Sequence, residues 1–122
     1  MTDNINASSG DKAQFYAERL AKMIRCKTVS EKNDFKPEEF LKLRKVIAEL
    51  FPLVTQKAEF TVFGDDAYLY KLKGKDETRN VMVMSHHDVV EATGDWQEKP
   101  FGGVIKDGKL WGRGTVDTKT PL

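Results

Sequence analysis

The feature of this sequence that most constrains its fold is an uninterrupted apolar run that ends in a cluster of polar side chains. The run is Val81–Met84, and Ser85-His86-His87-Asp88 follows it directly. A short run that is apolar at every position, rather than at alternate positions, is typical of a strand covered on both faces within an α/β sheet. The sequence therefore predicts an α/β fold in which 81–84 is the central strand.

Two helices are predicted upstream of this strand. Apolar residues at helical spacing predict a first helix that starts near Gly10 or Asp11 and ends within Cys26–Thr28. The same spacing predicts a second helix that begins at Pro37, because proline is well suited to the first helical position. This helix should continue to Phe51, and Pro52 should end it.

Two β-hairpins are predicted by apolar runs joined by turn-forming residues. The alternating runs 58–63 and 67–72 flank Gly64-Asp65-Asp66, which favours a tight turn between paired strands. A shorter hairpin is predicted around the turn Lys106-Asp107-Gly108-Lys109. The predicted chain thus combines two helices, a β-hairpin, a central strand and a short hairpin.

Composition and charge exclude several classes of protein. The 122 residues carry 20 Lys and Arg and 19 Asp and Glu side chains, a net charge of +1. Proteins that bind nucleic acid or membrane surfaces usually show a strong basic excess, and no stretch approaches the roughly 20 apolar residues that span a bilayer. Residues 1–10 lack a secretion signal and are expected to be a disordered tail. We expect one folded unit over 11–122, located in the cytoplasm, with its single cysteine, Cys26, buried as a small apolar side chain.

The side chains that follow the apolar run are candidate metal-site residues. In open α/β sheets, ligands bind at the carboxyl ends of the strands, where His86 and Asp88 are expected to lie. Residues two apart in extended chain face the same side, so Asp88 can contact one ring nitrogen of His86 while the other binds a metal. The alternative interpretation is a solvated His-His-Asp cluster that only terminates the strand.

A second candidate is the segment Gly112-Arg113-Gly114, with Asp117 just beyond it. Two glycines around an arginine indicate a backbone that turns sharply or passes close to another segment. The carboxylate of Asp117 would lie at the tip of this turn, and its two oxygens could bridge a pair of metal ions about 3.5–4 Å apart. Taken alone, the segment is better explained as a surface loop.

Together these motifs resemble a known enzyme family. The segments VMVMSHHDVV and IKDGKLWGRGTVDTK resemble the N-terminal part of the dizinc aminoacylase/carboxypeptidase family. That family includes acetylornithine deacetylase, succinyl-diaminopimelate desuccinylase, glutamate carboxypeptidase and carboxypeptidase S. The resemblance covers about a third of the chain, Val81–Lys119.

The resemblance implies a fold and a role for each candidate residue. Residues 11–122 would be the N-terminal portion of an αβα catalytic domain, truncated before its remaining metal ligands and its general-base glutamate. His86 would ligate one zinc ion and Asp117 would bridge two. Asp88 would act catalytically by orienting the site from behind His86, and the peptide bond after Asp117 would be cis. His87 occupies a variable position and would face the other side, although a ligand role for it remains an alternative.

The resemblance also implies an activity. The family points to a zinc-dependent hydrolase that cleaves the amide bond of a dipeptide or N-acyl amino acid, with two zinc ions, or cobalt or manganese, in the intact site. The 122 residues alone are expected to be inactive and to bind zinc poorly, because a catalytic zinc normally needs three protein ligands. The alternatives are a non-catalytic interaction module that forms homodimers, and a metal site built between two copies from His86 and His87.

Overall fold

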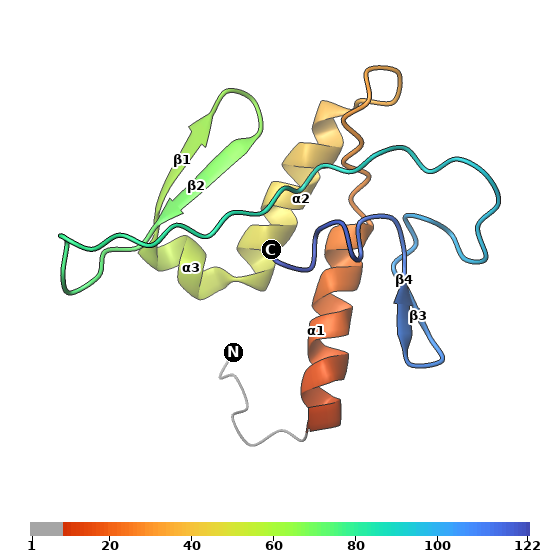
Figure 1. The fold of residues 1–122 in the computed structure, drawn as a ribbon, viewed down its shortest axis with the longest axis horizontal. Helices are drawn as coiled ribbons and strands as arrows, with labels where there is room; N and C mark the ends of the chain where they lie inside the picture. Colours follow the sequence, from red (N-terminus) through yellow and green to blue (C-terminus); the bar gives the residue numbers. More distant parts are fainter. Residues whose placement is uncertain (1–8) are drawn as a thin grey trace.

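A computed structural model describes residues 9–122. The predicted tail 1–10 lies outside the described residues except for its last two, which belong to the first helix. No helix in the described part is long and apolar enough to cross a membrane. The elements, in chain order, are α1 (Ser9–Ile24), α2 (Pro37–Leu50), α3 (Pro52–Lys57), β1 (Glu59–Phe63), β2 (Ala67–Lys71), β3 (Val104–Lys106) and β4 (Lys109–Trp111) (Figure 1).

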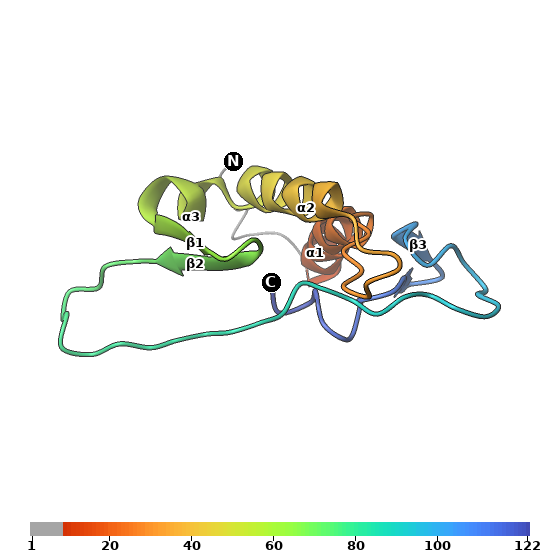
Figure 2. The ribbon, with the colours of Figure 1, turned by 90° about the horizontal axis from the view of Figure 1, so that it is seen from above.

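The hydrophobic core lies between α1 and α2, which pack side by side (Figures 1 and 2). Four buried side chains form its centre: Met23, Cys26, Leu43 and Leu50. Cys26 is a free thiol with no solvent exposure, which confirms that it serves as a small apolar side chain. Burial also raises the pKa of the Cys26 thiol, so the reactive thiolate is disfavoured.

The second helix begins at Pro37, as predicted, but Pro52 has an additional role. Phe51 has φ −124° and ψ 60°, which interrupts the helical backbone after α2. Pro52 then occupies the first position of α3, where its missing N–H has no helical partner to lose. Pro52 therefore both ends one helix and starts the next, and the sequence analysis missed the short helix α3.

Both predicted hairpins are confirmed. β1 pairs antiparallel with β2 in a register that places Phe63 opposite Ala67, and Gly64 turns the chain with a positive φ of 58°. β3 pairs with β4 in the same way, with Asp107 and Gly108 both at positive φ in the turn. Two consecutive residues at positive φ match a turn whose twist suits two paired strands.

The prediction of a central strand at Val81–Met84 is wrong for this structure, although the mixed helical and hairpin architecture agrees with the α/β class. The segment is extended but unpaired, and 75–92% of each residue is exposed. A wide cleft, with a volume of about 1060 Å³, separates it from the hairpin β1–β2. Figure 2 shows the segment running below the hairpin. A strand requires hydrogen-bonded neighbours, and residues 9–122 place none beside this run.

The loop that follows β4 is fastened to the C-terminal end of α1. The side chain of Lys119 is fully buried, and its ammonium group donates hydrogen bonds to the carbonyl oxygens of Met23 (3.1 Å) and Cys26 (2.6 Å). Carbonyls at a helix C-terminus carry partial negative charge and lack partners within the helix, so they favour a cation. Burial lowers the pKa of Lys119 to about 8.

The glycines of the Gly112-Arg113-Gly114 segment allow this close approach. A Cβ at Gly112 would lie 2.5 Å from Cγ2 of Ile24 in α1, which is too close for any side chain. Gly114 has φ +89°, and a Cβ there would lie 2.8 Å from Cγ1 of Val89. The motif is therefore a packing requirement: only glycine lets the loop lie between the helix and the chain around Val89.

Replacing Lys119 with Met should destabilise the fold. The apolar part of the side chain keeps its volume, but the carbonyls of Met23 and Cys26 lose the ammonium donor and keep only the backbone N–H groups of Cys26 and Thr28. We expect the free energy of unfolding in urea to fall by roughly 1.5–3 kcal/mol. Lys45→Met, at an exposed position on α2, is the matched control and should change it by no more than about 0.5 kcal/mol. An equal effect of both substitutions would contradict this role for Lys119.

Candidate metal centre

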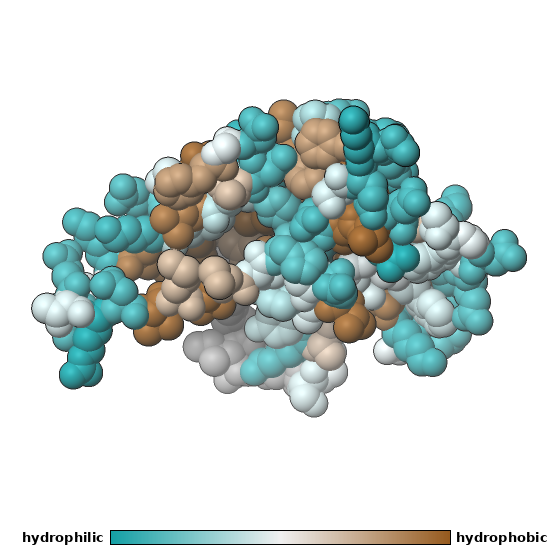
Figure 3. Space-filling model, turned by 45° about the horizontal axis from the view of Figure 1, so that its top comes forward, coloured by the Kyte–Doolittle hydropathy of each residue, from teal (hydrophilic) through white to brown (hydrophobic). Residues whose placement is uncertain are grey.

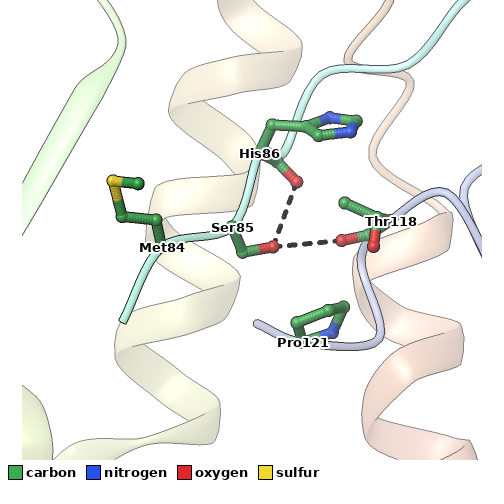
Figure 4. Close-up of a pocket in the computed structure, with 5 residues that line it drawn as sticks. All are labelled: Met84, Ser85, His86, Thr118 and Pro121. Carbon is green, nitrogen blue, oxygen red and sulfur yellow. Dashed lines mark hydrogen bonds between the residues drawn. The ribbon is translucent and has the colours of Figure 1, made fainter. Parts of the chain in front are cut away.

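The two candidate metal-binding segments meet beside the exposed apolar run. A shallow depression of about 400 Å³ lies there. Figure 4 shows Met84, Ser85 and His86 on one side of it and Thr118 and Pro121 on the other. The Ser85 hydroxyl donates to the carbonyl oxygen of Thr118 (3.2 Å). This contact joins two segments that are more than thirty residues apart in the chain.

The structure brings His86 and Asp117 into direct contact. Nε2 of His86 lies 3.0 Å from Oδ1 of Asp117, across 31 residues of sequence. Both side chains are accessible, with 53% of His86 and 89% of Asp117 exposed. The peptide bond between Asp117 and Thr118 is cis, as the family resemblance implied.

Asp88 lies on the opposite edge of the His86 ring. Nδ1 of His86 is 3.2 Å from Oδ1 of Asp88 and 3.1 Å from the carbonyl oxygen of the same residue. The other carboxylate oxygen, Oδ2, accepts a hydrogen bond from the Ser30 hydroxyl at 2.8 Å. This hydrogen bond from Ser30 is the main cause that lowers the pKa of Asp88, so the carboxylate stays ionised near neutral pH.

The segment that carries Ser30 is joined to the segment that carries Asp88 by backbone hydrogen bonds. Val29 and Val89 form an isolated parallel bridge, in which Val89 N–H donates to Thr28 O (2.8 Å) and Ser30 N–H donates to Val89 O (3.2 Å). Val29 and Val89 are both buried. The relative position of Ser30 and Asp88 is therefore set by the fold rather than by their side chains alone.

His87 points away from this cluster. Its ring lies against the rings of Phe40 (5.7 Å between centroids) and Tyr68 (4.9 Å), between α2 and the hairpin. Thr28 donates a hydrogen bond to its backbone carbonyl. Burial lowers the pKa of His87. These contacts agree with the expectation that His87 faces the other side.

The donors that converge fit a zinc ion in type but not in number. Imidazole nitrogen and carboxylate oxygen are ordinary zinc ligands, and two such donors on one tetrahedral ion are about 3.3–3.4 Å apart, close to the separation seen here. However, residues 9–122 contain no cluster of three or more His, Cys, Asp or Glu side chains that could hold a metal. The described chain thus offers two neighbouring donors, where a catalytic zinc normally has three protein ligands.

Three contributors to this region were missed by the sequence analysis. Ser30 and Thr28 lie almost sixty residues before the segment they bind, and nothing in their local sequence distinguishes them from loop residues. Lys119 belongs to the recognised motif, but its burial against α1 depends on a contact 96 residues away. Only a three-dimensional structure could show these pairings.

Comparisons with known proteins cover both segments of the site. The model of Peptidase family M20/M25/M40 matches residues 82–122. The chain is 35% identical over 111 residues to "Probable carboxypeptidase S-like 2" of Dictyostelium discoideum, covering 84% of this chain and 21% of that protein. It is 36% identical over 110 residues to "N-fatty-acyl-amino acid synthase/hydrolase PM20D1" of Xenopus tropicalis, with the same coverage. It is 43% identical over 67 residues to "Succinyl-diaminopimelate desuccinylase" of Ehrlichia ruminantium, covering 49% of this chain and 17% of that protein.

The chain is similar to the M20/M25/M40 peptidase family. This finding confirms the resemblance stated from the sequence. The matching segment contains His86, Asp88 and Asp117, the three residues singled out for the site. The carboxypeptidase S-like and PM20D1 relatives match most of this chain, but the chain spans only about a fifth of their length.

The two adjacent histidines should titrate in opposite directions. The hydrogen bond to the Asp88 carbonyl, helped by Asp117, raises the pKa of His86 above 6.5, whereas burial lowers the pKa of His87 below it. His86 should therefore contribute stability that is present below pH 6.5 and lost as the pH rises through its raised pKa. His87 should contribute stability that is present above pH 6.5 and lost as the pH falls through its lowered pKa.

Proton NMR of the two ring signals checks this prediction, since the chain has only two histidines. Asp117→Asn should lower the midpoint of His86 and leave that of His87 unchanged. A common midpoint for both rings would show that the described environments are not those in solution.

Proposed function

We propose that this chain supplies part of the metal centre of a zinc-dependent hydrolase that cleaves the amide bond of a dipeptide or an N-acyl amino acid. The observation that carries the proposal is the 3.0 Å approach of His86 Nε2 to Asp117 Oδ1. A nitrogen and a carboxylate donor from two distant segments converge on one point, and both segments lie within the family match.

The family resemblance implies the proposed roles, and the contact between the two side chains is compatible with them. His86 would hold one zinc ion, and the two carboxylate oxygens of Asp117 would be available to two ions. When bound, zinc lowers the pKa of a water molecule and polarises the carbonyl that is attacked. Asp88 contacts the Nδ1 edge of the His86 ring, so it holds the ring with Nε2 directed at Asp117 and increases the basicity of the ligand.

The substrate class is supported by the names of the relatives. A carboxypeptidase, an N-fatty-acyl-amino acid hydrolase and a desuccinylase are all similar to this chain. An amide bond to an amino acid is the chemistry that these names have in common. With only two donors, residues 9–122 should bind zinc, cobalt or manganese weakly and should not hydrolyse dipeptides on their own.

Zinc titration of the chain, followed by the ring signals of its two histidines, tests the proposal. Zn²⁺ should shift the His86 signals at millimolar concentration and leave those of His87 unchanged. Asp117→Asn should weaken the apparent affinity by at least tenfold. In His86→Ala, isothermal titration calorimetry should show the same loss of zinc affinity. Asp95→Asn, at an exposed position outside the site, is the control for Asp117→Asn.

Two results would contradict the proposal or its corollary. If Zn²⁺ affects the two histidines equally, or if Asp117→Asn behaves like Asp95→Asn, the two donors do not form a metal site. If the purified chain hydrolyses dipeptides at an appreciable rate with zinc or cobalt, its expected inactivity is wrong.

A second candidate function, self-association, is favoured by the exposed run Val81–Met84. These four residues are extended, apolar and unpaired in the described chain, and such an edge readily pairs with another strand. The run also borders the cleft beside β2, and Figure 3 shows apolar side chains gathered around a hollow on this side of the molecule.

Val83→Lys should reduce this association, because a lysine on an edge strand opposes strand pairing. We expect light scattering to show dimers of the unmodified chain at high concentration and mainly monomers of the variant. Val116→Lys, which alters an equally exposed valine outside the run, should have no effect. A monomeric unmodified chain at high concentration would rule out this candidate.

A further inference from the structure

We propose that Ser30 is a positioning residue of the metal centre: its hydroxyl group holds Asp88 against Nδ1 of His86, so that Nε2 keeps a free lone pair for the metal. This inference rests on the proposed function, because it assigns Ser30 a task only if His86 is a ligand. Ser30 touches neither the metal donors nor the depression beside them, and acts through Asp88.

The contacts form an unbroken series across the site. The Ser30 hydroxyl donates to Oδ2 of Asp88 at 2.8 Å, and Oδ1 of the same carboxylate lies 3.2 Å from Nδ1 of His86. On the far edge of the ring, Nε2 lies 3.0 Å from Oδ1 of Asp117. With one oxygen held by Ser30, the Asp88 carboxylate is restrained from rotating away from the ring.

The position of Ser30 is itself fixed by the backbone. Its N–H donates to the carbonyl of Val89 (3.2 Å), directly after Asp88, and Val89 N–H donates to the carbonyl of Thr28 (2.8 Å). The side chain at position 30 is exposed, so the hydroxyl is not needed to fill space in the core. Within residues 9–122, the hydroxyl group makes one hydrogen bond, which is the bond to Asp88.

The consequence concerns the tautomer of the neutral His86 ring. Nδ1 faces the carboxylate and the backbone carbonyl of Asp88, and Nε2 faces the carboxylate of Asp117, so either nitrogen could carry the single proton. A proton on Nδ1 leaves the Nε2 lone pair available to a metal, whereas a proton on Nε2 blocks it. By holding the Asp88 carboxylate at Nδ1, Ser30 adds to the effect of the Asp88 carbonyl. Together they favour the tautomer that can bind metal over the one in which Nε2–H donates to Asp117.

Nitrogen NMR of the metal-free chain tests this inference directly. Long-range correlation spectra at pH 9 report which ring nitrogen of neutral His86 carries the proton. In the unmodified chain we expect Nδ1–H to predominate, and in Ser30→Ala the population should shift towards Nε2–H. Ser30→Thr, which retains the hydroxyl group, should restore the original spectrum. Ser9→Ala, at an exposed position at the start of α1, is the control and should match the unmodified chain.

Zinc titration of the same variants supplies a second measurement. Ser30→Ala should weaken the apparent zinc affinity about tenfold, and Ser30→Thr should stay within about twofold of the unmodified chain. The inference is overturned if Ser30→Ala leaves the tautomer unchanged, or if Ser30→Thr behaves like Ser30→Ala. If His86→Ala leaves zinc binding intact, the proposed function fails, and the metal-free spectra still decide whether Ser30 controls the ring.

Discussion

The ammonium group of Lys119, buried against the last turn of α1, is the contact on which the arrangement of the site depends. A buried charge is costly unless it is well paired, and here the carbonyls of Met23 and Cys26 receive it. A second lysine, Lys42, donates to the carbonyl of Arg25 at the same helix end (3.0 Å). The end of α1 is thus surrounded by cations, as its partial negative charge favours, and the loop that carries Asp117 is tied to it.

The chain that leaves α1 holds the other half of the site. Immediately after Cys26 it runs parallel to the segment around Val89, and Ser30 reaches Asp88 from there. One helix terminus therefore positions Asp117 through Lys119 and positions His86 through Ser30 and Asp88. The two donors meet because both of their supports begin from the same rigid element. A shift of α1 relative to either segment would separate them.

Local sequence patterns were sufficient for the features that depend on near neighbours. Both hairpins have their turns at Gly64 and Gly108, where turn chemistry is decided within a few residues. The prediction of a strand at Val81–Met84 was wrong because a strand needs hydrogen-bonded partners from elsewhere in the chain. Residues 9–122 place no such partner beside this run. The hydrogen bonds of Ser30 and Lys119 span 58 and 96 residues, and no local pattern encodes such pairings. The candidate residues themselves were found because family motifs record such long-range constraints in short segments.

The contact between His86 and Asp117 does not require the apolar run Val81–Met84 to be part of a sheet. Val89 is buried and bonded to the chain after α1, whereas Val81–Met84 is exposed and unpaired, although the two are only a few residues apart. The chain thus changes from exposed and unpaired to hydrogen-bonded just before His86, where the Ser85 hydroxyl donates to the Thr118 carbonyl. The His86 ring is oriented by Asp88 and Asp117, which both follow this point in the sequence. The two side chains can therefore meet in a chain that spans about a fifth of its relatives' length. In the proposed metal centre, His86 and Asp117 would already lie side by side before a metal binds, so the binding free energy lost to ordering these two side chains would be small.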